Sequence, residues 1–202
     1  VSRMRSYHFF LNYERSTLYY FYDLYSYYAR QQEFPKEELI NVVMNKDLMS
    51  CLVSRSKSDP KEIVITRGYA SNKGPWKYTY LADEITLTRE SLIQSNDTYN
   101  SVFYTNGNKL YRWYNWNAEP KLPQTPVVTV GNNCEITCFD FSQNGKELYV
   151  GVYDPGLSGL KGCVYVYDAD ALDPVTNELK LLKKYEGIAD RPIKVFWKNN
   201  RK

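Results

Sequence analysis

Three aspartates stand close together at Asp168, Asp170 and Asp173, in the segment "DADALDP". Carboxylates at this spacing could hold a calcium ion, or supply the acid and base of a glycan-cleaving enzyme. An EF-hand loop starting at Asp168 would need a glycine at its sixth position and a glutamate at its twelfth, where Leu179 stands. Because aspartate and proline are also common where strands end, we expect a turn here rather than a metal site.

Nucleotide, zinc and triad chemistry receive less support from the residue types. The glycine-rich loop "DPGLSGLKG" at 154–162 lacks the GxxxxGK[ST] order of a phosphate-binding loop, so we expect its glycines to serve a turn. The single histidine, His8, and the absence of a CxxC pair disfavour a zinc site and a histidine-based triad. We expect no metal, no cofactor and no catalytic residue. A glycan-cleaving site would first be sought at Tyr167, Asp168 and Asp170.

The four cysteines, Cys51, Cys134, Cys138 and Cys163, are expected to be free thiols. Cys134 and Cys138 lie in an extended segment that separates their Cα atoms by roughly 13 Å, whereas a disulfide needs about 4.4 to 6.8 Å. Cys138 and Cys163 would stand two strands apart, at about 9.5 Å, which is also too far. Free buried thiols leave the redox compartment open.

A repeated pattern indicates the elements that must position these residues. A turn followed by leucine and an aromatic residue or methionine occurs at an average spacing of about 43 residues, around Leu18, Leu48, Leu110 and Leu148. In the two clearest copies, Asn106-Gly107 and Asn144-Gly145 supply the positive φ angles that tight hairpin turns need. The spacing is that of one four-stranded blade of a β-propeller.

We therefore predict an all-β fold, a β-propeller-like array of about four antiparallel blades, either by itself or as the C-terminal part of a larger propeller. In "LYVGVY" (148–153) both strand faces can be covered, as between stacked blades, although an irregular β-sandwich would also fit. We expect a single domain over 1–202, part of a longer chain. Its blades span roughly 6–40, 41–93, 95–130 and 134–187, with 191–198 opening or closing a further blade.

Aromatic clusters are the strongest functional signal, since the chain has 20 Tyr, 8 Phe and 4 Trp. Such side chains pack well on strands and dominate interface energies, so each cluster is either core packing or partner contact. The tyrosine-rich segment 17–35 has too many aromatics for one blade face to hide, so we expect part of it to contact another chain or an upstream domain. The candidates for ligand or partner contact are Trp76, Tyr78, Tyr111, Trp113, Tyr114, Trp116, Tyr19, Tyr22, Tyr25, Tyr27 and Tyr28.

Charge and hydropathy exclude other classes of function. The formal charge of +3 is far short of the basic stripe that nucleic-acid binding needs, so no nucleic-acid partner is expected. No run of about 18 apolar residues occurs that would span a membrane. The opening segment "VSRMRSYHFFLNYE" reaches charged and polar residues before an apolar core forms, unlike a signal peptide. We expect any export signal or anchor to lie upstream.

Three C-terminal segments carry a family resemblance: "FDFSQNGKELYVGVYDP", "GCVYVYDADALDPVTNEL" and "YEGIADRPIKVFWKN". They resemble the C-terminal half of the PKD-like surface lipoproteins encoded beside TonB-dependent nutrient transporters of the SusC/SusD kind. The resemblance is best from about Ile136 to Asn199, a third of the chain. In that family a lipidated N-terminus and immunoglobulin-like PKD modules precede a propeller-like region. The shared motifs are structural, so they assign no binding residue.

The resemblance implies a non-catalytic accessory lipoprotein on the extracellular face of the cell outer membrane. Its expected partners are a SusC-like TonB-dependent transporter and a SusD-like lipoprotein, and its expected ligand is an oligosaccharide or a peptide. Contact with the membrane would come only through an upstream lipid anchor. Two alternatives stand beside it: a general β-propeller interaction scaffold, and a propeller-fold glycan lyase or hydrolase.

Overall fold

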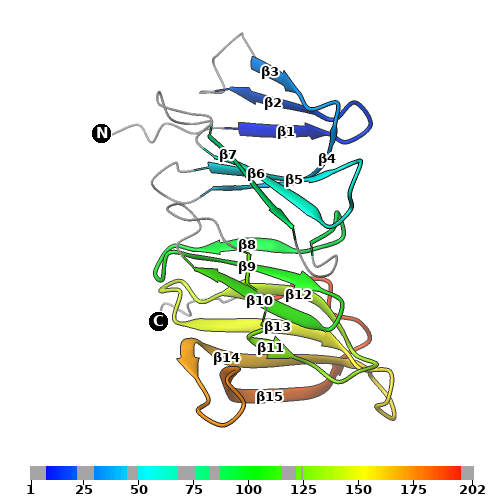
Figure 1. Cartoon of the computed structure of the whole chain (residues 1–202). Helices are drawn as coiled ribbons and strands as arrows, with labels where there is room; N and C mark the ends of the chain where they lie inside the picture. Colours follow the sequence, from blue (N-terminus) through cyan, green and yellow to red (C-terminus); the bar gives the residue numbers. More distant parts are fainter. Residues whose placement is uncertain are drawn as a thin grey trace, which may run out of the picture. The chain divides into compact units, whose positions relative to one another are not determined.

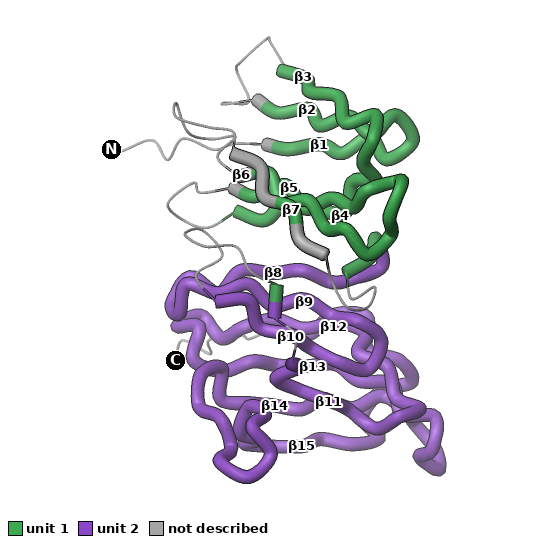
Figure 2. Tube along the Cα trace, in the orientation of Figure 1, with its two compact units in different colours: residues 1–89, 117–122 green, residues 90–116, 123–202 purple. Residues whose placement is uncertain are grey.

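The structure is a computed structural model that describes residues 8–21, 30–44, 50–67, 76–81, 87–114, 122–123 and 125–196. Every regular element in these residues is a β-strand, as the all-β prediction requires (Figure 1). The chain divides into two compact units (Figure 2). Unit 1 comprises Val1–Arg89 and Asn117–Leu122, and unit 2 comprises Glu90–Trp116 and Pro123–Lys202.

Unit 1 contains two antiparallel sheets whose strands pair in chain order. The first sheet has β1 (His8–Asn12), β2 (Thr17–Phe21) and β3 (Arg30–Glu33), and the second has β4 (Glu37–Met44), β5 (Ser50–Ser56), β6 (Glu62–Arg67) and β7 (Trp76–Leu81). Leu18 of the first sheet packs with Leu39 and Leu52 of the second, and all three side chains are fully buried. Burial of these leucines holds the two sheets together.

Unit 2 contains two antiparallel sheets as well, and each of them has four strands. The third sheet has β8 (Ile93–Asn96), β9 (Ser101–Asn106), β10 (Lys109–Tyr114) and β11 (Val128–Thr129), and the fourth has β12 (Glu135–Phe141), β13 (Glu147–Tyr153), β14 (Gly162–Leu172) and β15 (Leu179–Ala189). Phe103 and Leu110 of the third sheet form one apolar core with Val150 and Tyr165 of the fourth. These two sheets therefore pack face to face within the unit.

The two predicted hairpins are confirmed. In the β9–β10 hairpin, Asn106 pairs with Lys109 across a two-residue loop whose first residue, Gly107, has φ of 58°, as in a type II′ turn. Gly145 between β12 and β13 has φ of 69°. In both turns the glycine alone carries the positive φ, whereas the sequence had suggested that the asparagine would share it.

The sheet boundaries differ from the predicted blade limits at several places. The second sheet begins at Glu37, inside the range predicted for the first blade, because the turn at Phe34 and Pro35 ends the pairing of β3. The third sheet begins at Ile93, near the end of the second predicted range. The four strands predicted at 134–187 form as β12 to β15.

The predicted strand at 191–198 is wrong over its described part, since Arg191–Phe196 contains no strand. This return segment instead crosses the face of the fourth sheet. A Cβ atom placed on Gly151 would come 3.0 Å from Pro192 Cβ, and one on Gly162 would come 2.9 Å from Pro192 Cδ. The two glycines therefore make room for a proline that itself cannot donate a ladder hydrogen bond.

No helix in the described residues has the length and apolar character needed to cross a membrane.

Candidate functional site

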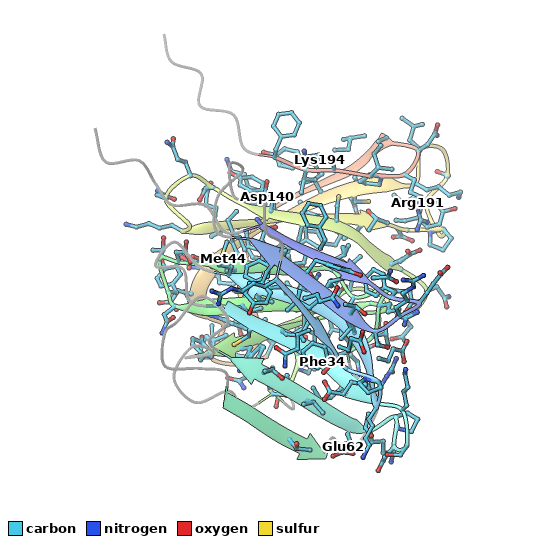
Figure 3. All side chains as sticks on the ribbon, turned by 90° about the horizontal axis from the view of Figure 1, so that it is seen from above. Phe34, Met44, Glu62, Asp140, Arg191 and Lys194 are labelled. Atoms are coloured by element: carbon cyan, nitrogen blue, oxygen red, sulfur yellow. The ribbon has the colours of Figure 1, made fainter. Side chains whose placement is uncertain are left out.

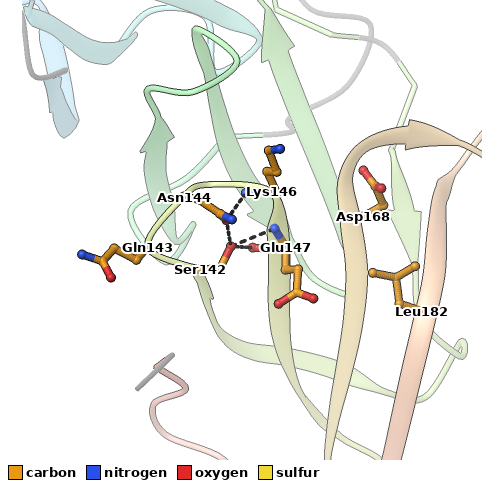
Figure 4. A pocket seen from close by; sticks show the side chains of 7 residues that line it. All are labelled: Ser142, Gln143, Asn144, Lys146, Glu147, Asp168 and Leu182. Atoms are coloured by element: carbon orange, nitrogen blue, oxygen red, sulfur yellow. Dashed lines mark hydrogen bonds between the residues drawn. The ribbon is translucent and has the colours of Figure 1, made fainter. Parts of the chain in front are cut away.

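A polar pocket opens in unit 2 where the β12–β13 hairpin meets strands β14 and β15 (Figure 4). Its volume is about 540 Å³, within the range of small-ligand sites. The residues that line this hairpin pocket are Ser142, Gln143, Asn144, Lys146, Glu147, Asp168 and Leu182. Hydroxyl, amide, carboxylate, ammonium and aliphatic groups thus meet around one opening.

Local hydrogen bonds fix the hairpin that forms one wall of the pocket. Ser142 Oγ donates to Asn144 Oδ1 at 2.7 Å, and it accepts the Glu147 backbone N–H at 2.9 Å (Figure 4). Asn144 Oδ1 also accepts the Lys146 N–H at 3.1 Å. Serine and asparagine side chains commonly form such hydrogen bonds to nearby backbone groups in turns. The sequence "SQNGKE" therefore preorganises the hairpin wall of the pocket.

The third sheet braces the same hairpin from outside. Asn96 Nδ2 donates to the Gly145 carbonyl and Thr98 Oγ1 to the Asn144 carbonyl, each at 2.8 Å. Asn96 is buried, and a Cβ atom on Gly145 would lie only 2.7 Å from its Oδ1. Glycine at 145 is therefore required by its φ angle and by this close approach together.

Two acidic residues of the pocket are direct cross-strand neighbours, because Glu147 of β13 pairs in register with Asp168 of β14. Asp168 Oδ1 accepts the backbone N–H groups of Ala171 and Asp170, each at 2.9 Å, and these bonds lower the pKa of Asp168. Tyr149 donates its hydroxyl to Glu147 Oε2, and burial followed by this bond raises the pKa of Tyr149. Neither carboxylate has a lysine or arginine nitrogen within 4.0 Å in the described part of the chain.

Beside the pocket, Arg112 of β10 is buried between the third and fourth sheets. Its side chain is fully buried, and Nη2 donates to Asp170 Oδ1 at 2.8 Å. Its guanidinium carbon lies 4.0 Å from the ring centre of Tyr114 and 5.3 Å from that of Tyr99. One carboxylate and the aromatic faces thus compensate the buried charge. We interpret this cluster as a structural link, because Arg112 is fully buried and its Nη2 and Nε already donate to Asp170 and Ser101.

Apolar side chains are exposed on β15 and on the return segment. Tyr185 and Ile188 of β15 expose 47% and 54% of their surface, and Ile193 and Phe196 of the return segment expose 86% and 66%. The return segment also carries Arg191 and Lys194, labelled in Figure 3. Arg191 pairs with Glu135 at 2.6 Å and lies over the Tyr153 ring. We call Tyr185, Ile188, Ile193 and Phe196 the apolar row.

Comparisons with known proteins bear on the fold. No family model matches the chain, and no curated protein matches it. Among solved structures it is similar to one described as an oligogalacturonate lyase in complex with manganese, with a TM-score of 0.52 and 13% identity over 87% of this chain and 52% of that chain. A mitotic checkpoint complex aligns at a TM-score of 0.47 and 12% identity, over 77% of this chain and 42% of that chain.

The fold is a β-propeller-like array. Four antiparallel sheets of three or four strands, together with the likeness to the solved lyase structure, show it. At such low identity the likeness shows the fold alone. The chain spans about half the length of the lyase chain and less than half of the other.

The propeller-like structure separates the predicted site residues into three groups. Tyr111 and Trp113 are each only 1% exposed, so they pack in the core and do not reach a partner, which corrects their selection as contact residues. Tyr114 is 47% exposed over Arg112, and Tyr19 is half-buried. Trp76 and Tyr78 belong to β7, but their side chains lie outside the described residues. Trp116, Tyr22, Tyr25, Tyr27 and Tyr28 also lie outside the described residues.

The aspartate-rich stretch is a turn only in part, since Asp168 and Asp170 lie in β14 and Asp173 precedes the turn at 174–176. Asp173 Oδ1 accepts the backbone N–H groups of Val175 and Thr176, in the same manner as Asp168 with its own following residues. No group of three or more metal-ligating side chains that could hold an ion occurs within the described ranges. Tyr167 is 7% exposed and belongs to the core, whereas Asp168 lines the pocket and Asp170 binds Arg112. The three residues therefore do not converge on one opening.

Sequence reasoning missed the hairpin pocket and the buried arginine. The segment "SQNGKE" was interpreted only as a turn, although its serine, amides and glutamate also give it a polar wall. Arg112 is buried, although nothing in the sequence marks it as buried. Its interleaving with aromatic residues in "LYRWY" is the one signal that could have suggested cation–π packing.

Proposed function

We propose that this chain is part of a non-catalytic accessory surface lipoprotein of an outer-membrane TonB-dependent nutrient-uptake complex. In this role it docks on a SusC-like transporter and a SusD-like lipoprotein at the extracellular face. The resemblance of the segment from about Ile136 to Asn199 to PKD-like lipoproteins motivates the proposal, and the propeller-like scaffold agrees with it. An upstream lipid anchor would hold the protein at the membrane.

The apolar row is the single observation that supports docking best. The four side chains of the apolar row stand in solvent, with exposed fractions from 47% for Tyr185 to 86% for Ile193, and Leu181 and Leu182 of β15 are exposed as well. Large apolar side chains in solvent cost solubility, and a contiguous apolar surface is typical of sites that another protein covers. Aromatic residues are also enriched at the centres of interfaces.

The test is affinity purification of the full-length native protein from detergent-solubilised outer membranes, with mass spectrometry of the bound proteins. We expect a TonB-dependent transporter and its SusD-like lid to be recovered. Replacing Ile193 and Phe196 together by aspartate should abolish the recovery. Val175→Asp is the matched control, because Val175 is 90% exposed but lies on the turn before β15.

Retention of the transporter by the double aspartate variant would refute the apolar row as the contact. Purification of the wild-type protein without any transporter would refute the accessory role itself. The general interaction scaffold would then be the function to pursue, with the same surface as the first place to search for a partner.

The positions of the carboxylates argue against the lyase or hydrolase alternative. A catalytic general acid needs a raised pKa, whereas backbone N–H groups lower the pKa of Asp168. Tyr167 is buried and its pKa is raised by burial, so it cannot reach a glycan. We accordingly expect no release of reducing ends or unsaturated products from pectic, xylan or glucan oligosaccharides.

A further inference from the structure

We infer that the hairpin pocket binds the basic side chain of an extended peptide, with its guanidinium or ammonium group between Glu147 and Asp168. This inference goes beyond the proposed docking role and does not depend on it, since the apolar row contributes no residue to the pocket lining. It rests on the register, hydrogen bonding and charge of the pocket residues.

The register places two like charges at one opening. Glu147 and Asp168 are directly opposed on antiparallel strands, and both line the pocket. Opposed like charges destabilise a sheet, whereas a cation between them would reverse the sign of the interaction. Lys146 is the single basic residue of the lining, so the pocket walls carry a net negative charge.

Each carboxylate is held in place and keeps one oxygen available. Asp168 uses Oδ1 for two backbone N–H groups, and Glu147 uses Oε2 for the Tyr149 hydroxyl. Among the described residues, neither Asp168 Oδ2 nor Glu147 Oε1 has a hydrogen-bond partner within the chain. Two anchored acceptors on paired residues of neighbouring strands suit the several N–H donors of arginine or lysine.

The other lining groups suit the rest of such a side chain. Leu182 of β15 lies on the Asp168 side of the opening, with Glu147 on the other (Figure 4). An aliphatic wall can pack against the methylene stem of lysine or arginine while the charged head reaches the carboxylates. The amides of Gln143 and Asn144 at the rim can bind peptide backbone groups. A peptide therefore matches more of the lining than a small free amine.

The experiment is a titration of the ¹⁵N-labelled chain, followed by NMR chemical shifts, with four blocked tripeptides that differ only at the central residue. We expect saturable shifts around Glu147 and Asp168 with the Ac-Gly-Arg-Gly-NH2 and lysine peptides, and none with the glutamine and glutamate peptides. Equal binding of the glutamine peptide would overturn the proposal. Spermidine and glucosamine distinguish other sources of cations, and tighter binding by either would overturn the assignment to a peptide.

Two isosteric variants locate the cation. Glu147→Gln and Asp168→Asn keep the oxygen that accepts the existing hydrogen bonds but lose the charge. Each should therefore lower the affinity for the arginine peptide by about fivefold or more. Asp190→Asn is the matched control, because Asp190 is exposed and does not line the pocket. Unchanged backbone shifts outside the hairpin verify folding. Affinity that neither pocket variant reduces would refute the site.

Discussion

Arg112 Nη2 donates a hydrogen bond to Asp170 Oδ1 at 2.8 Å, and this ion pair joins β10 of the third sheet to β14 of the fourth. The two partners of the ion pair lie in different environments, since the Arg112 side chain is fully buried and that of Asp170 is 50% exposed. Burial of the guanidinium would be costly without a partner. The pair therefore makes the packing of the two sheets depend on one half-exposed carboxylate.

Asp170→Asn tests this dependence. The amide can still accept one hydrogen bond but no longer neutralises Arg112, and Arg112 Nη1 already lacks a partner among the described residues. We expect a loss of about 1 to 3 kcal/mol in the free energy of unfolding, below the full cost of breaking a buried pair because Asp170 is half exposed. Urea titration measures it. Asp173→Asn, just after the end of β14, should show no comparable loss of stability. Equal effects of the two substitutions would contradict the structural role of the Arg112–Asp170 pair.

Gly145→Ala should destabilise unit 2 more than Gly107→Ala. Both glycines have positive φ, 69° and 58°, so alanine at either position costs about 1 to 2 kcal/mol from the backbone alone. At Gly145 the new methyl would also collide with Thr98 and Asn96, whereas nothing lies within 4 Å of it at Gly107. The difference between the two midpoints of thermal unfolding reports this packing. Equal midpoints would show that the third sheet does not brace the hairpin.

Asp168 should contribute an acid-sensitive part of the stability. Backbone N–H groups lower its pKa in the folded state, below the value of about 3.9 expected when unfolded. Its stabilisation is therefore present above pH 4 and is lost as the pH falls through the lower folded pKa. Unfolding free energies measured between pH 6 and 2 should fall less steeply for Asp168→Asn than for the wild type. Parallel curves would mean that the N–H groups do not favour the ionised form.

The thiols should differ in reactivity. Cys51 and Cys163 are fully buried and Cys138 is 9% exposed, whereas Cys134 is half-buried. Burial raises the pKa of Cys134 and of Cys138, and Asp154 adds to the rise at Cys134, so alkylation of both needs alkaline pH. Mass spectrometry after iodoacetamide treatment should find Cys134 labelled first. Labelling of Cys163 at the same rate would imply that the fourth sheet opens readily.

Local signals in the sequence were sufficient to predict β12 to β15. The Asn144-Gly145 turn predicted the β12–β13 hairpin, and the alternation of valine with tyrosine predicted β13 and β14, because both signals depend on neighbouring residues. The same signals placed Tyr111 and Trp113 on a strand but could not distinguish core from surface. Their burial depends on which other strands cover them, and that is decided by residues far away in the chain.

The return segment and the hairpin pocket were missed for the same reason. "RPIKVFWK" has the composition of a strand, yet Pro192 lies over Gly151 and Gly162, which are 41 and 30 positions earlier. The pocket combines a hairpin wall with Asp168 and Leu182 from two further strands. Neither arrangement leaves a periodic pattern in any short window of sequence.

The brace between Asn96 and Gly145 also has a consequence for how the chain reaches this structure. Asn96 and Gly145 are 49 positions apart, and Arg112 and Asp170 are 58 apart. Contacts between residues so far apart in the chain stabilise the fold only after a long loop has closed. Such contacts therefore slow folding relative to chains rich in local contacts. We expect the fourth-sheet hairpin to gain this brace only once β8 is in place. During synthesis, β8 leaves the ribosome before the hairpin that it braces.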